Sequence, residues 1–254
     1  MTAASPGIWL VRENALALGN RLQQQLNGEL FTPRQQVDQT QQERFRTIFT
    51  TRSQWVLVMA TGIATRFMDG LPQDKRTDPA VVVVDEAGRF AIPLLSGHEG
   101  GANALACRIA NCIDAIPVIT TATETLKPLV IGIGCRKGVS VGQIEQAVCH
   151  ALGERYKDEI REVATIDVKA EEPGLLAFCQ KNALPLRIIR RETVAARAWV
   201  TRPSDWVEQN IGVPGVCEPC ALIASPRGRL LAPKTTLDGV AVAIVEDRTE
   251  WNDS

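Results

Sequence analysis

Short apolar runs alternate with amphipathic stretches at the start of the chain. Apolar runs cover residues 8–11 and 29–32, and amphipathic stretches cover 15–26 and 43–51. Runs of this length are typical of buried strands, whereas apolar positions three or four residues apart are typical of helices that pack on one face. The pattern therefore predicts a β-α-β-α arrangement.

The next region predicts the centre of the same sheet. Residues 55–60 form an apolar run that leads directly into a glycine turn at 61–66, which can open a helix. Residues 80–84 are an alanine and four valines, as expected for a central strand covered by helices on both faces. Residues 85–89 predict a tight turn, and 90–95 predict a strand that returns as a hairpin.

A helix, a short strand and a linker close the first domain. Apolar residues between 105 and 113 are spaced as on one helical face, and residues 117–120 predict a strand. Residues 124–128 are mostly polar and end in proline, which is typical of a linker. The sequence thus predicts an amino-terminal domain at 1–123 and a carboxy-terminal domain at 129–254.

The second domain continues the alternation of strands and helices. Its predicted elements are a strand at 129–133, a loop at 134–138, a helix at 141–152, further elements at 163–168, 175–182 and 186–189, and strands at 230–233 and 240–245. Lys234 is expected to lead into the turn between the last two strands. The predicted fold class is α/β, with two α/β domains whose mostly parallel sheets are flanked by helices.

Composition excludes several functional classes. The net charge is -1 and the basic residues are scattered, which argues against a nucleic-acid surface. No apolar run approaches the roughly 18–20 residues that a membrane span needs, and the first residues lack a basic segment before an apolar one, so we expect a cytoplasmic protein. The seven cysteines lie mostly in apolar helical patterns and are expected to be reduced.

The loop at 96–103 is the most informative candidate site. Three glycines surround His98 between a predicted strand and a predicted helix, and glycines let backbone N–H groups approach a ligand. The ordinary imidazole pKa of about 6.5 suits proton transfer at neutral pH. The alternative is a structural histidine that binds its own loop. His150 lies within a helical pattern, where a packing or surface role is favoured.

Three further segments have alternative interpretations. The glycines at 132–138, with Arg136 and Lys137, can hold an anion or form an ordinary turn, and their spacing is not that of an ATP or NAD site. Cys217 and Cys220 have the spacing of a zinc or redox pair, but no second pair stands nearby. Glu218 precedes an apolar helix, where its carboxylate can cap the helix or face a ligand.

Several segments together resemble one family, the cobalt-precorrin-5A hydrolases of anaerobic cobalamin biosynthesis. The segments similar to the family's amino-terminal domain are, in order, Thr-Gly-Ile-Ala-Thr-Arg at 61–66, Asp-Lys at 74–75, Thr-Asp-Pro-Ala-Val at 77–81, Asp-Glu-Ala-Gly-Arg-Phe at 85–90 and Leu-Leu-Ser-Gly-His-Glu-Gly-Gly-Ala-Asn at 94–103. Those similar to its carboxy-terminal domain are Gly-Ile-Gly-Cys-Arg-Lys-Gly at 132–138, Gly-Val-Pro-Gly-Val-Cys-Glu at 212–218, and Lys234. The resemblance covers most of the chain from about Trp55 onward.

The chain departs from the family pattern in two places. Longer members carry a middle segment between the domains, whereas Thr123 is followed here almost at once by the strand at 129–133. This chain therefore resembles a short form of the family. Cys217 and Cys220 stand where small apolar residues such as alanine are expected, which favours a packing role for the pair.

The resemblance implies opening of a δ-lactone on a cobalt-bound tetrapyrrole, followed by loss of a two-carbon fragment as acetaldehyde. Such chemistry needs an acid–base group, oxyanion donors and cations for peripheral carboxylates. From residue chemistry we assign the first role to His98 and the second to the N–H groups around Gly100 and Gly101. The remaining candidates are substrate-binding residues: Arg66, Lys75, Arg136 and Lys137 as carboxylate anchors, with Ser96, Asn103 and Glu218.

The resemblance implies no cofactor or protein-bound metal, because the cobalt arrives inside the substrate. The expected partner is that small-molecule tetrapyrrole, with no nucleic acid and no membrane; a homodimer and association with other corrin-pathway enzymes stay open. One alternative function is a non-catalytic protein that binds or transfers a corrin intermediate. A more distant alternative is an unrelated enzyme that uses the loop at 97–103 to hold a phosphorylated metabolite.

Overall fold

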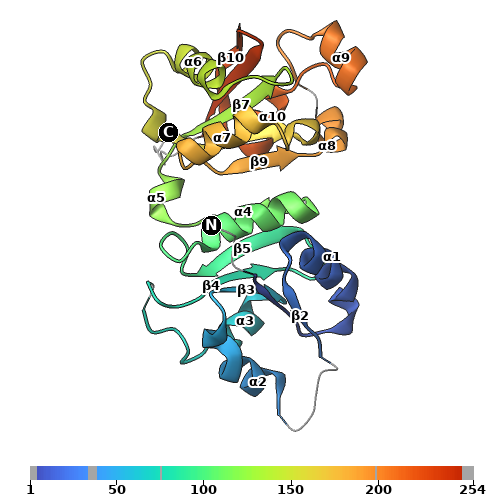
Figure 1. Ribbon diagram of the computed structural model, residues 1–254, viewed down its shortest axis with the longest axis vertical. Coiled ribbons are helices and arrows are strands. Elements are labelled where there is room, and N and C mark those ends of the chain that lie inside the picture. The colour runs from blue at the N-terminus through green and yellow to red at the C-terminus, as the bar shows by residue number, and fades with distance from the viewer. Residues whose placement is uncertain (1–4, 34–38, 75, 198, 248–254) are drawn as a thin grey trace, which may run out of the picture. The chain divides into compact units, whose positions relative to one another are not determined.

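The chain folds into two compact units, residues 1–121 and 122–254, in a computed structural model that describes residues 5–33, 39–74, 76–197 and 199–247 (Figure 1). Each unit contains its own mixed sheet with helices packed on it. The predicted α/β class with two domains is therefore confirmed. Within the described residues, no helix combines the length and apolar character that crossing a membrane requires.

The first unit is built on a six-stranded sheet with the order β2-β1-β3-β4-β5-β6. Its strands are β1 (Gly7–Leu10), β2 (Glu29–Phe31), β3 (Gln54–Val58), β4 (Ala80–Val84), β5 (Phe90–Leu95) and β6 (Ile116–Pro117). All neighbouring strands are parallel except β4 and β5, which are antiparallel. The predicted hairpin is confirmed, and the valine strand β4 is central and buried along its length.

The hairpin between β4 and β5 is fixed by one carboxylate. Asp85 Oδ1 accepts hydrogen bonds from the backbone N–H groups of Arg89 at 2.7 Å and Phe90 at 2.8 Å. Gly88 adopts a φ of 67°, which favours glycine over residues with a side chain. These bonds hold the pKa of Asp85 below its usual value despite partial burial. The turn therefore reverses the chain and makes β5 antiparallel.

Alternate residues of the strands serve the two faces of the first sheet. Ile8, Val56 and Val82 pack with α1 and α4, whereas Val81 and Val83 pack with α2 and α3. Figure 1 shows α4 on one face of this sheet and α2 and α3 on the other. The helices are α1 (Leu16–Leu26), α2 (Gln41–Ile48), α3 (Thr61–Phe67) and α4 (Ala102–Ile113). Short 3-10 turns lie at Glu13–Ala15 and Phe49–Thr51.

The second unit is built on a five-stranded sheet with the order β10-β11-β7-β8-β9. Its strands are β7 (Leu129–Cys135), β8 (Ile160–Ile166), β9 (Leu186–Ile189), β10 (Arg229–Leu237) and β11 (Val240–Glu246). β7, β8 and β9 are mutually parallel, but β11 is antiparallel to both β7 and β10. The sheet of this unit is therefore mixed: four of its five described strands run in the same direction, and β11 of the final hairpin runs against them.

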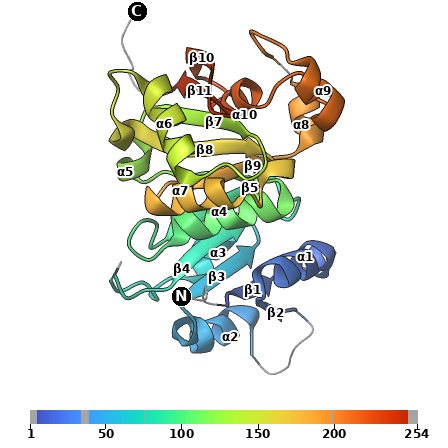
Figure 2. The ribbon, with the colours of Figure 1, turned by 45° about the horizontal axis from the view of Figure 1, so that its top comes forward.

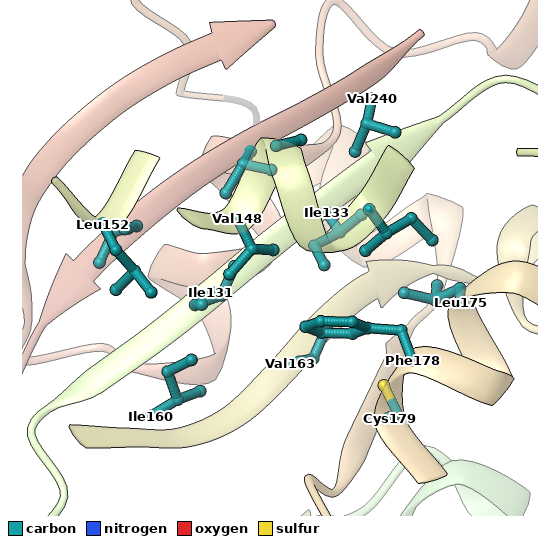
Figure 3. Packing of buried hydrophobic residues seen from close by; sticks show 14 of the residues in the cluster. Ile131, Ile133, Val148, Leu152, Ile160, Val163, Leu175, Phe178, Cys179 and Val240 are labelled. Carbon is teal, nitrogen blue, oxygen red and sulfur yellow. The ribbon is translucent and has the colours of Figure 1, made fainter. Parts of the chain in front are cut away.

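Helices cover both faces of the second sheet. Figure 3 shows Val148 of α6 and Phe178 of α7 over Ile131 of β7 and Val163 of β8. The opposite face packs against α8 and α10 through residues such as Val194. Figure 2 shows α6 and α7 next to each other on the first of these two faces. The helices are α5 (Ala122–Thr125), α6 (Val141–Leu152), α7 (Pro173–Lys181), α8 (Arg191–Ala196), α9 (Asp205–Ile211) and α10 (Cys217–Ala224), with 3-10 turns at Lys157–Glu159 and Asp167–Lys169.

Two local predictions for the second unit are corrected by strand pairing, and a helix lies at the start of the predicted linker. Gly134 and Cys135 were expected in a loop, but they pair with Ala241 and Val240 and extend β7. Lys234 was expected before a turn, but it lies within β10, and the turn falls at 238–239. The segment at 124–128, expected as a linker, begins within the short helix α5.

Candidate functional site

The loop between β5 and α4 closes back on itself. The backbone carbonyl of Ser96 accepts from Ala102 N at 3.1 Å, and that of Gly97 accepts from Asn103 N at 2.9 Å. A Cβ on Gly100 would lie 2.3 Å from the Cβ of Ser96, so this position requires glycine. The first N–H groups of α4 are therefore bound within the loop rather than directed at a ligand.

The side chains of this loop divide into internal and outward groups. Ser96 is buried and donates its hydroxyl proton to the carbonyl of Asp78, and Asn103 donates from Nδ2 to Thr121 Oγ1 at 2.8 Å. His98 is exposed. The backbone N–H groups of Gly100 and Gly101 donate no hydrogen bond to another described residue. Ser96 and Asn103 thus support the loop, whereas the His98 imidazole lies at its surface.

Arg66 and His98 lie at opposite ends of the strands of the first sheet. Arg66 is exposed on α3, which follows the carboxyl end of β3. Because β5 runs antiparallel, its own carboxyl end lies beside the start of β4, as the bond from Ser96 to Asp78 shows. The structure therefore does not bring these two candidates together. Lys75, the third cationic candidate of this unit, lies outside the described residues.

The second unit contains a pocket of about 380 Å³. Its lining includes Gly134 and Arg136 from the first segment that resembles the family, Gly215 and Cys217 from the second, and Lys234 from β10. These segments are far apart in the sequence. They meet because β7 lies beside β11, β11 lies beside β10, and α10 packs across the same sheet.

Cations dominate the charged lining of the pocket. Arg136, Lys169 and Lys234 line it, and Asp238 is the one carboxylate among the lining residues described. Lys137 is exposed but does not line the pocket. Lys169 was not among the residues expected from the sequence. It follows β8, and the carboxyl ends of the parallel strands β7 and β8 lie at one edge of the sheet, so strand order is the signal that could have identified it.

Glu218 does not cap the helix that it was expected to begin. It lies inside α10, where its side chain is almost fully buried at 1% exposure. Its carboxylate accepts hydrogen bonds from Thr201 N at 2.8 Å and Lys234 N at 2.9 Å, and from the Thr201 hydroxyl. The buried carboxylate thus joins α10 to β10 and to the segment before α9, on two sides of the pocket.

Two cysteine side chains also line the pocket. Burial raises the pKa of the Cys217 thiol to about 12 and that of Cys135 to about 11, so both are neutral thiols at physiological pH. Cys220 is fully buried in α10. Across the described residues, no three or more Cys, His, Asp and Glu side chains are grouped so that they could hold a metal ion.

Two family models match this chain in sequence order. The model described as Cobalamin synthesis G N-terminal matches residues 43–124, and the model described as Cobalamin synthesis G C-terminus matches residues 129–245. The first match contains the loop of His98, and the second contains the whole pocket lining. Each candidate region therefore lies within a segment that the family shares.

Relatives with assigned names agree with this match. A cobalt-precorrin-5A hydrolase from Priestia megaterium is 22% identical over 297 residues, covering 78% of this chain and 79% of that protein. The hydrolase of Salmonella typhimurium is 54% identical over 79 residues, which are 31% of this chain and only 22% of that protein. Protein CobE from a Sinorhizobium species is 30% identical over 118 residues, covering 45% of this chain and 77% of CobE.

Proposed function

This chain belongs to the cobalt-precorrin-5A hydrolase family, and we propose on that premise that it opens the δ-lactone of cobalt-precorrin-5A and releases acetaldehyde, giving cobalt-precorrin-5B. The single observation that carries the proposal is the ordered match of both family domains to residues 43–124 and 129–245. The 297-residue alignment with the Priestia hydrolase exceeds the 254 residues of this chain, so that relative has residues without a counterpart here. This supports assignment to a short form of the family.

The proposed reaction has two bond-breaking steps. Water adds to the lactone carbonyl carbon, and the acyl carbon–oxygen bond breaks to give a carboxylate and a hydroxyl group. The hydroxyl then loses its proton as its carbon–oxygen bond becomes a carbonyl. The carbon–carbon bond to the macrocycle breaks, acetaldehyde departs, and the conjugated ring takes the electron pair. The cobalt belongs to the substrate, so the proposal includes no resident cofactor.

The exposed loop of the first unit supports an acid–base role. His98 is the side chain assigned to proton transfer, and the N–H groups of Gly100 and Gly101, which donate to no described residue, are the assigned oxyanion donors. Ser96 and Asn103 act through the loop, which they hold in shape. Arg136 and Lys137 remain the assigned carboxylate anchors of the second unit. We assign the reaction to the cytoplasm.

Acetaldehyde release tests the proposal. The purified protein is incubated anaerobically with cobalt-precorrin-5A, and acetaldehyde is followed by NADH oxidation with alcohol dehydrogenase. The expected result is one equivalent of acetaldehyde per substrate consumed, and none in a reaction without protein. Binding of the substrate with no acetaldehyde would contradict the hydrolase assignment and favour a protein that binds or transfers a corrin intermediate.

A further inference from the structure

The pocket of the second unit combines cations with one exposed aromatic ring. Trp206, on α9, lines the pocket and is 62% exposed. Among the other described tryptophans, Trp9 and Trp55 are buried, and Trp199 is exposed but does not line the pocket. A large indole surface beside positive charge is suited to a flat, conjugated ligand that carries negative groups.

Two of the pocket cations are available to a ligand. Neither the Arg136 guanidinium nor the Lys234 ammonium forms an ion pair with a residue that the structure describes. Lys169, in contrast, lies 3.7 Å from a carboxylate oxygen of Glu172, and the other oxygen of Glu172 accepts from Gly138 N. The charge of Lys169 is thus partly compensated, whereas Arg136 and Lys234 form no ion pair with a described residue, and Asp238 is the one described carboxylate that shares the pocket with them.

The backbone around the pocket holds these cations in place. Arg136 N donates to the carbonyl of Gly239 at 2.9 Å, and Lys234 N donates to the buried carboxylate of Glu218. Helix α10 also begins at the pocket, where Cys217 is part of the lining, and its amino end adds partial positive charge. Because their backbones are fixed independently of their side chains, both cations can be neutralised without loss of these bonds.

The volume of the pocket limits what it can enclose. At about 380 Å³ it lies near the lower end of the roughly 300–1,000 Å³ that is typical of pockets for drug-sized ligands. A tetrapyrrole with acetate and propionate side chains is larger than such a ligand. The pocket can therefore hold one edge of the macrocycle but not the whole of it.

From these observations we infer that this pocket binds one carboxylate-bearing edge of the tetrapyrrole substrate. Arg136 and Lys234 pair with peripheral carboxylates, and Trp206 covers the adjacent ring face. The inference rests on the proposed function for the identity of the macrocycle. It adds Lys234 and Trp206 as residues that select a substrate whose side chains are free acids.

Binding of two matched cobalt corrins tests the inference on the full-length protein. Cobyrinic acid carries free peripheral carboxylates, whereas cobinamide carries amides on the same type of ring. Quenching of tryptophan fluorescence reports binding of either compound. Lys234→Gln and Arg136→Gln should each weaken cobyrinic acid binding about tenfold, which corresponds to loss of one charge-assisted contact of about 1.4 kcal/mol, and should leave cobinamide binding unchanged.

Two control variants identify the site. Lys181→Gln removes a cation of α7 that pairs with Glu145 outside the pocket, and it should bind cobyrinic acid as the wild type does. Trp206→Phe should remove most of the saturable quenching, whereas Trp199→Phe, which changes an exposed indole that does not line the pocket, should retain it. Circular dichroism checks that each variant is folded.

The outcomes separate this inference from the proposed function. If folded Lys234→Gln and Arg136→Gln bind cobyrinic acid as tightly as the wild type, the pocket assignment is wrong even when acetaldehyde release is intact. Equal affinity of the wild type for cobinamide and cobyrinic acid would also overturn it. If binding follows charge but no acetaldehyde is released, the pocket assignment stands and the hydrolase proposal fails.

Discussion

Glu218 is a buried carboxylate whose bonds fix two sides of the pocket. In Glu218→Gln one oxygen becomes an NH₂ group, which would face the N–H group of either Thr201 or Lys234. A buried donor without an acceptor costs about 1–3 kcal/mol. We therefore expect Glu218→Gln to lower the free energy of unfolding by about that amount, measured by urea denaturation.

The matched control for this change is Glu208→Gln on α9, where the side chain is exposed. It should change the free energy of unfolding by less than about 0.5 kcal/mol, as is usual for surface substitutions. A positioning role also predicts that Glu218→Gln weakens cobyrinic acid binding at temperatures where the variant is folded. Unchanged stability and unchanged binding together would show that the carboxylate has no such role.

His98 is assigned to proton transfer, and the assignment predicts a specific kinetic change. Removal of a general acid–base group typically lowers turnover about 10²–10⁴-fold. We expect His98→Ala to lower kcat for acetaldehyde release within that range while substrate binding persists, because the role assigned to this exposed imidazole is proton transfer and not binding. His150→Ala, which changes an exposed residue of α6, is the control and should turn over normally. Normal turnover by His98→Ala would remove this residue from the mechanism.

The cysteines differ in the reactivity that their surroundings allow. Burial raises the pKa of Cys217 to about 12, so at pH 8 only about one such thiol in ten thousand is ionised, whereas a free thiol has a pKa of about 8.5. The thiolate fraction rises with pH and stays small until the pH approaches 12. We expect iodoacetamide at pH 8 to modify exposed Cys149 and to spare Cys217 until urea unfolds the chain, as mapped by mass spectrometry. Rapid labelling of native Cys217 would instead favour a redox role for its pair with Cys220.

Most strands and helices could be predicted because the apolar pattern reflects local burial. The valines of β4 are apolar in every position because α4 covers one face and α2 and α3 cover the other. The errors occur where a distant partner decides the structure. Gly134 and Cys135 have the composition of a loop, yet pairing with β11 makes them part of β7. Lys234 follows a proline, yet pairing with the same strand extends β10 beyond it.

Contact between β7 and α10 depends on one glycine. A Cβ on Gly132 would lie 1.7 Å from the backbone carbonyl oxygen of Cys217, so an alanine here would force the helix away from the sheet. We expect Gly132→Ala to lower the free energy of unfolding by about 3 kcal/mol or more, since overpacking against backbone cannot be relieved by a change of rotamer.

Gly142 provides the opposite case within the same unit. It lies in α6 and is exposed. A Cβ added at this position would meet only Ser140 Oγ, at 3.9 Å, which is an ordinary contact distance. Alanine is favoured over glycine in a helix by about 0.8–1.0 kcal/mol, so Gly142→Ala should raise the free energy of unfolding. If the two alanine variants had equal stability in urea, close packing of α10 on β7 would not be the reason for glycine at position 132.

The candidate sites were only partly predictable because they depend on how distant segments meet. The sequence identified the loop of His98, the turn of Arg136 and the carboxylate of Glu218. It did not identify Lys169 or Trp206, which join the pocket through sheet order and through α9. It also placed Arg66 in the same set as His98, although the antiparallel β5 puts these residues at opposite ends of the strands of the sheet. Candidate residues can be predicted from their chemistry, but which of them lie close together depends on the order and direction of the strands.

The two units have separate cores, which predicts that they can be separated. The buried clusters of residues 122–254 contain no residue of the first unit. We expect a fragment of residues 122–254 to unfold cooperatively in urea and to bind cobyrinic acid with an affinity near that of the full chain. Because His98 belongs to the other unit, the fragment should release no acetaldehyde from cobalt-precorrin-5A, and acetaldehyde release by the fragment alone would transfer the chemistry to the second unit.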